Sequence, residues 1–234
     1  MRVLTSSVSS VIGKIDEPHR TDLLRRGCQK DLRRGEYLFF KGDPARRVWS
    51  IESGVMKLCL SDEYGRMNLL GLAPEGDIIG ELAASDGDAQ PFDALTATPC
   101  VLNSFDAKVF MDTVLSSPAA ATELCAQMAA RSRSVLEAIT ERTNGDVTAR
   151  LAGRLLDLAE TLGRMSAGTI EMDVPLAQED IGRLAGMCRE STCRTMRRLK
   201  ADGILDYSGR RLRILRPDVL EHLRCGGRAA KPCR

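Results

Sequence analysis

The stretch that decides the fold is Ile181–Lys200, IGRLAGMCRESTCRTMRRLK, in which two short helical segments meet at Gly186-Met187-Cys188. Two helices joined by a three-residue turn that contains glycine are the layout of a helix-turn-helix. The pattern predicts helices over Glu179–Ala185 and Arg189–Ala201. The second of them is the candidate recognition helix.

This second helix has two chemically different faces when its residues are placed at about 100° each. Four side chains share one face and are expected to pack inward: Thr192, Thr195, Met196 and Leu199. The opposite face holds five others: Arg189, Glu190, Cys193, Arg194 and Arg197. An arginine presents paired donors to guanine O6 and N7, and a glutamate accepts a hydrogen bond from cytosine N4. We therefore expect Arg189, Glu190 and Arg194 to contact bases of double-stranded DNA. A purely structural amphipathic helix would divide its faces in a similar way, but it has less reason to expose three arginines together.

A basic hairpin is expected directly after this helix. Ile204–Tyr207 and Arg211–Leu215 flank the turn signal Ser208-Gly209, and Arg211 and Arg213 alternate with apolar residues. Two helices followed by such a hairpin form a winged helix-turn-helix. Both arginines are expected to contact phosphate rather than bases.

The charge of the chain is unevenly distributed. The net charge is +2, but residues 1–145 sum to −3 and residues 146–234 to +5. Within Arg183–Arg216 there are 10 basic and 3 acidic side chains. A basic block confined to one stretch favours a polyanionic partner there, with Arg197 as a further phosphate contact. A solvated charged face remains the simpler alternative for the charge alone.

Residues 32–106 have the pattern of an antiparallel β-roll. Glycine turns divide this stretch into short runs about ten residues apart, which is typical of an all-β barrel or sandwich. The expected strands include Tyr37–Lys41, Val55–Leu60, Met67–Leu72 and, as the last, Val101–Phe105. We assign residues 1–117 to this domain.

A long helix is predicted over Ala119–Arg142, which contains no glycine or proline. Four apolar residues form one stripe along it, at spacings of four, seven and four: Leu124, Met128, Val135 and Ile139. The stripe could pair with a second copy of the chain and form a homodimer, although Arg131 and Ser132 interrupt it. Packing of the helix against its own β domain fits the pattern equally well.

The sequence Asn144-Gly145-Asp146 marks a domain boundary. Gly145 suits a left-handed helix end, and Asp146 suits the N-cap of the next helix. We therefore expect an α+β chain with the β-roll first, a dimerisation helix and hinge over residues 118–145, the winged helix-turn-helix over 146–225 and a flexible tail over 226–234.

Several classes of protein are not expected. Apolar runs are too short to span a bilayer, and Met1–Pro18 lacks the apolar core of a secretory signal, so we expect a cytoplasmic protein with thiols rather than disulfides. The chain has no phosphate-cradling Gly-Lys loop, no paired-histidine helix and no Cys-x-x-Cys, so it is not expected to be an enzyme. The spacing of His222, Cys225 and Cys233 matches no zinc motif, so no metal site is expected.

From about Leu32 to Leu223, the sequence resembles the catabolite-activator/fumarate-nitrate-regulator (CRP/FNR) family of bacterial transcription regulators. The similar segments, in order, are Gly35-Glu36-Tyr37-Leu38-Phe39, Gly76-Asp77, Gly80-Glu81-Leu82, Ala126-Gln127-Met128-Ala129, Asp146-Val147-Thr148, and Ile181-Gly182 through Gly186 to Arg194. The resemblance implies a cyclic-nucleotide-binding-like β-roll, a homodimer, and RNA polymerase as a partner if the protein is an activator.

The resemblance also gives roles to individual residues. In the family, the first, second and sixth residues of the recognition helix contact bases, and these are Arg189, Glu190 and Arg194 here. This set resembles the branch that reads TGTGA-like half-sites. Cys188 stands where a small hydroxyl residue would contact phosphate.

The sequence departs from the cyclic-nucleotide binders of the family at two places. These proteins have an Arg-Ser pair after the Gly-Glu-Leu turn, but Pro91 and Phe92 stand there, and Ser85–Ala94 contains no arginine or lysine. Burying a phosphate without a cation costs several kcal/mol. The positions that would contact adenine are Val135 and Leu136, which cannot hydrogen-bond it. Cyclic AMP (cAMP) is therefore not expected to be the effector.

The sequence also offers few ligands for an iron–sulfur cluster or a haem. An iron–sulfur cluster would need four clustered cysteines near the N-terminus, where only Cys28 lies. His19 and His222 are the only histidines, and neither lies in an expected strand of the roll. We predict no cofactor, and sensing through haem or a gas stays open.

A small metabolite, no ligand at all, and thiol redox state are the other open alternatives for the effector. Cys188 and Cys193 lie at or near the start of the recognition helix, where the helix N-terminus and neighbouring arginines favour a thiolate. The alternative is that both are small packing residues. A further alternative for the whole chain is a cyclic-nucleotide-binding-like module that acts on a protein partner, against which the basic recognition helix argues.

Overall fold

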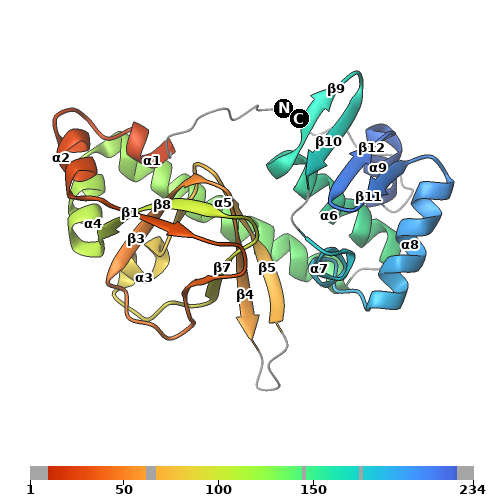
Figure 1. The fold of residues 1–234 in the computed structure, drawn as a ribbon, viewed down its shortest axis with the longest axis horizontal. Helices are drawn as coiled ribbons and strands as arrows, with labels where there is room; N and C mark the ends of the chain where they lie inside the picture. Colours follow the sequence, from red (N-terminus) through yellow and green to blue (C-terminus); the bar gives the residue numbers. More distant parts are fainter. Residues whose placement is uncertain (1–9, 62–66, 144–145, 174–175, 226–234) are drawn as a thin grey trace. The chain divides into compact units, whose positions relative to one another are not determined.

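In the computed structural model, the chain divides into two units, residues 1–134 and 135–234, each of which is described by itself (Figure 1). The structure describes residues 10–61, 67–143, 146–173 and 176–225.

The N-terminal unit is a roll of two four-stranded antiparallel sheets with helices at its ends (Figure 1). The sheets have the orders β1-β8-β3-β6 and β2-β7-β4-β5. Their strands are β1 (Cys28–Leu32), β2 (Tyr37–Phe39), β3 (Arg47–Ser53), β4 (Val55–Ser61), β5 (Met67–Pro74), β6 (Ile78–Ile79), β7 (Asp93–Thr96) and β8 (Cys100–Asp106). The helices are α1 (Ser10–Gly13), α2 (His19–Arg26), α3 (Glu81–Asp86), α4 (Ala107–Leu115) and α5 (Pro118–Thr143), of which α5 continues past residue 134 into the second unit. The predicted β-roll and long helix are confirmed, although the roll begins at Cys28 rather than near residue 32.

The core of the roll lies between the two sheets and is aromatic. Phe39 packs against both Trp49 and Phe92, with ring centroids 5.3 and 6.0 Å apart, and all three side chains are buried. Gly80 begins α3 with a φ of +88°, and a Cβ there would lie 2.9 Å from the Trp49 ring. Only glycine therefore fits the turn that places Glu81.

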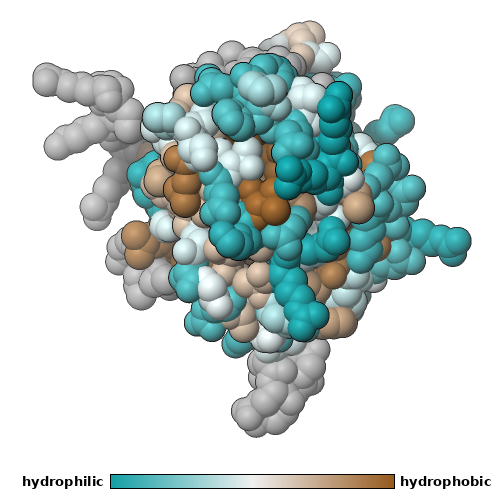
Figure 2. Space-filling view, turned by 90° about the vertical axis from the view of Figure 1, so that its left-hand side faces the viewer, coloured by the Kyte–Doolittle hydropathy of each residue, from teal (hydrophilic) through white to brown (hydrophobic). Residues whose placement is uncertain are grey.

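A second core cluster lies under the helices of this unit and includes Leu23, Phe105, Phe110 and Leu124. Figure 2 views the molecule from the side of α2 and α4, where hydrophilic side chains separate several apolar patches. Such a mixed face is ordinary for a surface in water.

The C-terminal unit is a winged helix-turn-helix, as predicted. Its elements are α6 (Val147–Leu162), β9 (Arg164–Ser166), β10 (Thr169–Asp173), α7 (Gln178–Leu184), α8 (Arg189–Ala201), β11 (Leu205–Ser208), β12 (Arg211–Ile214) and α9 (Pro217–Arg224). The strands form one antiparallel sheet in the order β11-β12-β10-β9. Strand β9 and helix α9 were not expected.

The N-cap of α6 and the hairpin turn of this unit each differ in how they match the prediction. The Asp146 carboxylate accepts a hydrogen bond from the N–H of Thr148 at 3.0 Å, which confirms the N-cap, whereas Gly145 lies outside the described residues. The hairpin turn is Gly209-Arg210 rather than Ser208-Gly209, because Ser208 still pairs with Arg211. Gly209 has a φ of +59°, which glycine adopts without strain.

Candidate nucleic-acid interface

The recognition helix α8 is held against α7 by a very close contact. A Cβ on Gly182 of α7 would lie 2.0 Å from Oγ1 of Thr192, so a larger residue cannot stand there. The Thr192 hydroxyl donates to the carbonyl of Cys188 at 2.9 Å. The four residues expected to face inward are all buried: Thr192, Thr195, Met196 and Leu199. This face of the helix is confirmed.

The opposite face of α8 is open to solvent. Arg189, Glu190, Arg194 and Arg197 are exposed, and Cys193 is half-buried. All but Arg189 line a shallow open hollow on this face. Among the residues that the structure describes, none forms an ion pair or a hydrogen bond with the side chains of Arg189, Arg194 or Arg197. Their donors are therefore available to base edges or phosphates, and the contacts themselves stay predictions.

Cys188 caps the start of α8 and is exposed. Its thiol donates to the Ser191 hydroxyl at 3.3 Å. The pKa of the Cys188 thiol is lowered, first because the Ser191 side chain and then the Ser191 and Glu190 N–H groups stabilise the thiolate, while the Glu190 charge opposes this. Serine and backbone groups, rather than the neighbouring arginines, are thus the source of the expected shift. The Cys193 thiol donates to the Gln178 amide oxygen at 3.7 Å.

The two arginines of the wing differ in their surroundings. Arg211 and Arg213 are both exposed on β12 and alternate with buried Leu212 and Ile214. Nε of Arg213 lies 3.0 Å from a carboxylate oxygen of Glu171, whereas no described residue forms an ion pair with Arg211. Arg211 can therefore contact phosphate without losing an ion pair. Arg213 would have to divide its donors between the phosphate and the Glu171 carboxylate.

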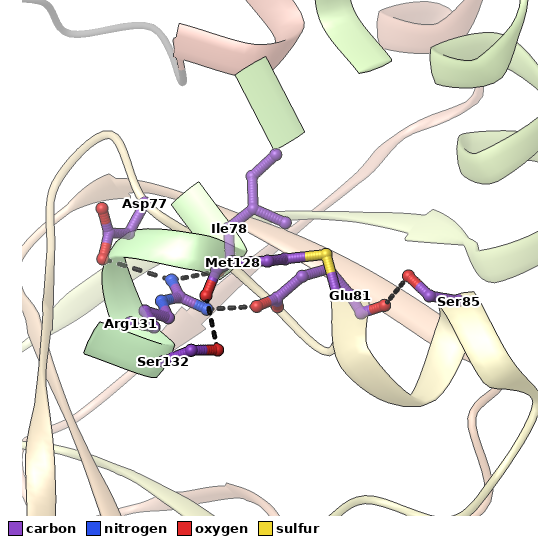
Figure 3. Close-up of polar contacts among 7 residues, drawn as sticks. All are labelled: Asp77, Ile78, Glu81, Ser85, Met128, Arg131 and Ser132. Atoms are coloured by element: carbon purple, nitrogen blue, oxygen red, sulfur yellow. Dashed lines mark hydrogen bonds and ion pairs between the residues drawn. The ribbon is translucent and has the colours of Figure 1, made fainter. Parts of the chain in front are cut away.

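In the N-terminal unit, Arg131 of α5 is directed at residues 77–81, which run from the residue before β6 to the first residue of α3 (Figure 3). Its guanidinium forms an ion pair with Glu81, lies 3.3 Å from the Asp77 carboxylate and donates to the carbonyl of Ile78 at 2.6 Å. Burial raises the pKa of both carboxyls, and the charge of Arg131 opposes the rise. Arg131 thus interrupts the apolar stripe because it is a structural ion-pair partner. An arginine within an apolar stripe was the sequence signal for this role.

The region that follows the Gly-Glu-Leu turn contains no cation. Pro91 is exposed, and Phe92 is buried against Phe39 in the aromatic core. One carboxylate oxygen of Glu81 and the side-chain amide of Gln90 are buried and make no hydrogen bond within the described chain. These polar groups are thus a carboxylate oxygen and a neutral amide, and neither carries the positive charge that would bind an anion strongly.

The structure changes the expected dimer seam on α5. Leu124 lies in the core of its own unit at 4% exposure, and Met128 is half-buried against the same cluster. Leu124 therefore has almost no surface left for a second copy, which corrects its assignment. Val135 stays exposed at 48% and adjoins Leu136, exposed at 63%. The side chain of Ile139 lies outside the described residues.

The part of the chain that the structure describes offers neither a metal site nor a membrane-spanning helix. It holds no group of three histidine, cysteine or carboxylate side chains that could bind a metal ion. Its seven cysteines are free thiols, and Cys233 lies outside it. None of its helices is both long and apolar enough to cross a bilayer.

Comparison with known proteins places both units in one family. The model of the Crp-like helix-turn-helix domain matches residues 149–223, and that of the cyclic nucleotide-binding domain matches residues 29–117. A CRP-like cAMP-activated global transcriptional regulator from Mycobacterium tuberculosis is 28% identical over 85% of this chain and 89% of its own length. The cAMP-activated global transcriptional regulator CRP of Escherichia coli is 27% identical over 74% of this chain and 82% of its own.

A solved structure shows the same fold. FixK2 from Bradyrhizobium japonicum has a TM-score of 0.75 at 21% identity, and the match covers 88% of this chain and 98% of that one. The two domain models match the two units separately, and the curated relatives extend across both. The chain therefore belongs to the CRP/FNR family and is a transcription regulator with a helix-turn-helix DNA-binding domain.

Proposed function

We propose that the protein is a dimeric, sequence-specific regulator that reads a palindromic DNA site with TGTGA-like half-sites. The observation that supports this most is the open face of α8, where Arg189 and Arg194 are exposed and free of ion pairs in the described chain beside exposed Glu190. Arg189 and Arg194 would each read a guanine, and Glu190 a cytosine. Cys188, Arg197, Arg211 and Arg213 would contact phosphate.

Selection of bound duplexes from a random pool tests this proposal. The expected result is a two-fold symmetric site whose half-sites are about one helical turn apart. Failure to enrich any duplex would favour the alternative, a regulatory module that acts on a protein partner. Ultracentrifugation of Val135→Asp tests the dimer, because a charge at the exposed seam should give a monomer. A variant that stays dimeric would place the interface elsewhere.

We further propose that the effector is not cAMP, although the two curated relatives are named as cAMP-activated. The missing cation near Pro91 and the buried aromatic Phe92 support this proposal, as do the apolar Val135 and Leu136. Haem, a gas, a small metabolite or no ligand at all stay open, and an absorbance spectrum of anaerobically purified protein would show haem. RNA polymerase would be a partner if the protein activates transcription.

Thiol redox state is the alternative effector that a specific observation favours. The pKa of exposed Cys188 is lowered, and the thiolate is the form that oxidises. A sulfinate there would place negative charge next to phosphate. Peroxide treatment should therefore weaken DNA binding of the wild type but not of Cys188→Ser/Cys193→Ser. Equal loss in both proteins would remove these thiols from the mechanism.

A further inference from the structure

Two adjacent arginines near the end of α8 have different surroundings. Arg197 borders the open hollow on the exposed face and has no polar partner in the described chain. Arg198 lies about 100° further round the helix. Its guanidinium donates to the hydroxyl of Thr148 at 2.6 Å. Thr148 is only 5% exposed, so the hydrogen bond holds the Arg198 side chain against a buried residue of its own unit. The Arg197 side chain makes no such bond within the described chain.

Thr148 is itself held in place at the start of α6. Its N–H donates to the Asp146 carboxylate, which caps this helix. Two residues later, Nε of Arg150 donates to the carbonyl of Ala185 at 3.1 Å, at the end of α7. The first turn of α6 is therefore bonded to α8 through Arg198 and to α7 through Arg150. These bonds fix both helices of the helix-turn-helix to the residues that follow the domain boundary.

We infer that Arg198 is a positioning residue for DNA recognition rather than a DNA contact. A charge-assisted hydrogen bond to a buried hydroxyl is strong and directional, so it fixes the rotation of α8 relative to α6. Arg189 and Arg194 must reach base edges with defined geometry, and a rotation of the helix would misplace both together. This inference rests on the proposed function.

The salt dependence and the sequence specificity of DNA binding distinguish the proposed role of Arg197 from that of Arg198. Dissociation constants of the full-length protein are measured over a salt series, for the selected duplex and for one with a substituted half-site. Arg197→Met, as the phosphate contact, should weaken both duplexes alike and lower the salt slope by about 1 for each protomer. Arg198→Met should weaken the selected duplex about tenfold, reduce its preference over the substituted one and leave the slope unchanged.

Variants of Thr148 test whether the hydrogen bond is the cause. Thr148→Val keeps the shape of the side chain but removes the acceptor, so it should reproduce the loss of specificity in Arg198→Met. Thr148→Ser keeps the hydroxyl and should bind like the wild type. The double variant Thr148→Val/Arg198→Met should be no weaker than either single one, because both remove the same bond. All are measured below the melting temperature of the least stable variant.

Three outcomes would overturn the inference: a fall in the salt slope of Arg198→Met equal to that of Arg197→Met, additive losses in the double variant, or unchanged affinity and specificity in Arg198→Met. Each would show that Arg198 contacts phosphate directly or has no part in recognition. A wild-type protein that binds no duplex would instead overturn the proposed function.

Discussion

In the N-terminal unit, the guanidinium of Arg131 in α5 forms ion pairs with Asp77 and the buried Glu81, whereas Arg189 and Arg194 of α8 lie exposed with no ion pair in the described chain. A guanidinium that pairs with a buried carboxylate is part of the fold. One that has no carboxylate partner offers its donors to an external acceptor such as a base edge or a phosphate. Exposure and pairing, rather than residue type, therefore distinguish the structural arginine from the candidate recognition arginines.

The largest expected effect concerns Arg131. Arg131→Met would leave the Glu81 carboxylate buried without its cation, since that side chain is only 3% exposed. Removing one partner of a buried ion pair typically lowers the free energy of unfolding by about 3 kcal/mol or more. Trp49, the single tryptophan, lies in the same unit and reports its unfolding by fluorescence.

The matched control is Arg133→Met, which removes an exposed arginine of the same helix and should change the free energy of unfolding little. Adding Glu81→Gln to Arg131→Met should recover part of the loss, because the unpaired charge is then gone. If Arg131→Met and Arg133→Met were equally stable, Arg131 would not be a structural residue, and it would no longer differ in this respect from Arg189 and Arg194.

The second prediction concerns the exposed arginines. Arg189→Ala should reduce discrimination at one symmetric base pair of each half-site by about 1–3 kcal/mol, because the paired donors to guanine are lost. Binding-site selection with wild type and variant measures this change, and the stability of the C-terminal unit should stay nearly unaltered. If both proteins select the same bases at every position, Arg189 does not read sequence.

Local patterns made the recognition helix predictable. The glycine turn and the inward face of α8 both depend on residues that are close together in the sequence. The predicted range of the helix, Arg189–Ala201, is the observed one. Contacts between distant residues left no comparable signal. The ion pair of Arg131 with Glu81 and the hydrogen bond of Arg198 with Thr148 each join residues 50 positions apart.

The apolar stripe on α5 shows the limit of periodicity. A stripe predicts that one helix face is buried, but it does not say by what. Leu124 and Val135 lie on the same predicted stripe, yet the first packs into its own unit and the second remains exposed. Arg131 interrupts the stripe between these two residues. The environment of the helix changes there from the core to the surface, and the spacing of apolar residues alone did not show this change.

A third prediction uses the pH dependence of the Arg131 cluster. Burial raises the pKa of Glu81 above its ordinary value of 4.5, so the folded state binds this proton more tightly than the unfolded state does. The contribution of this carboxyl to the free energy of unfolding therefore falls as the pH rises from 4.5 through the raised pKa. Glu81→Gln should lose the part of this slope that comes from Glu81 and keep the part that comes from Asp77, whose pKa burial also raises, in urea titrations followed by Trp49 fluorescence. Exposed Glu75→Gln should keep the whole slope. The same slope in wild type and Glu81→Gln would assign the effect to another group.

The smallest expected effect is that of cAMP on the wild-type protein. A cyclic phosphate after the Gly-Glu-Leu turn would meet no arginine or lysine in Ser85–Ala94, and Arg131 is already bound to Glu81. Calorimetry should therefore detect no low-micromolar binding of cAMP or cGMP, and neither should change DNA affinity. Pro91→Arg would supply a cation at an exposed position without opening the aromatic core, and measurable cAMP binding by this variant would identify the missing charge as the cause. Tight cAMP binding by the wild type, with a matching gain in DNA affinity, would overturn this prediction and show that the N-terminal unit holds the phosphate without an arginine or lysine in Ser85–Ala94.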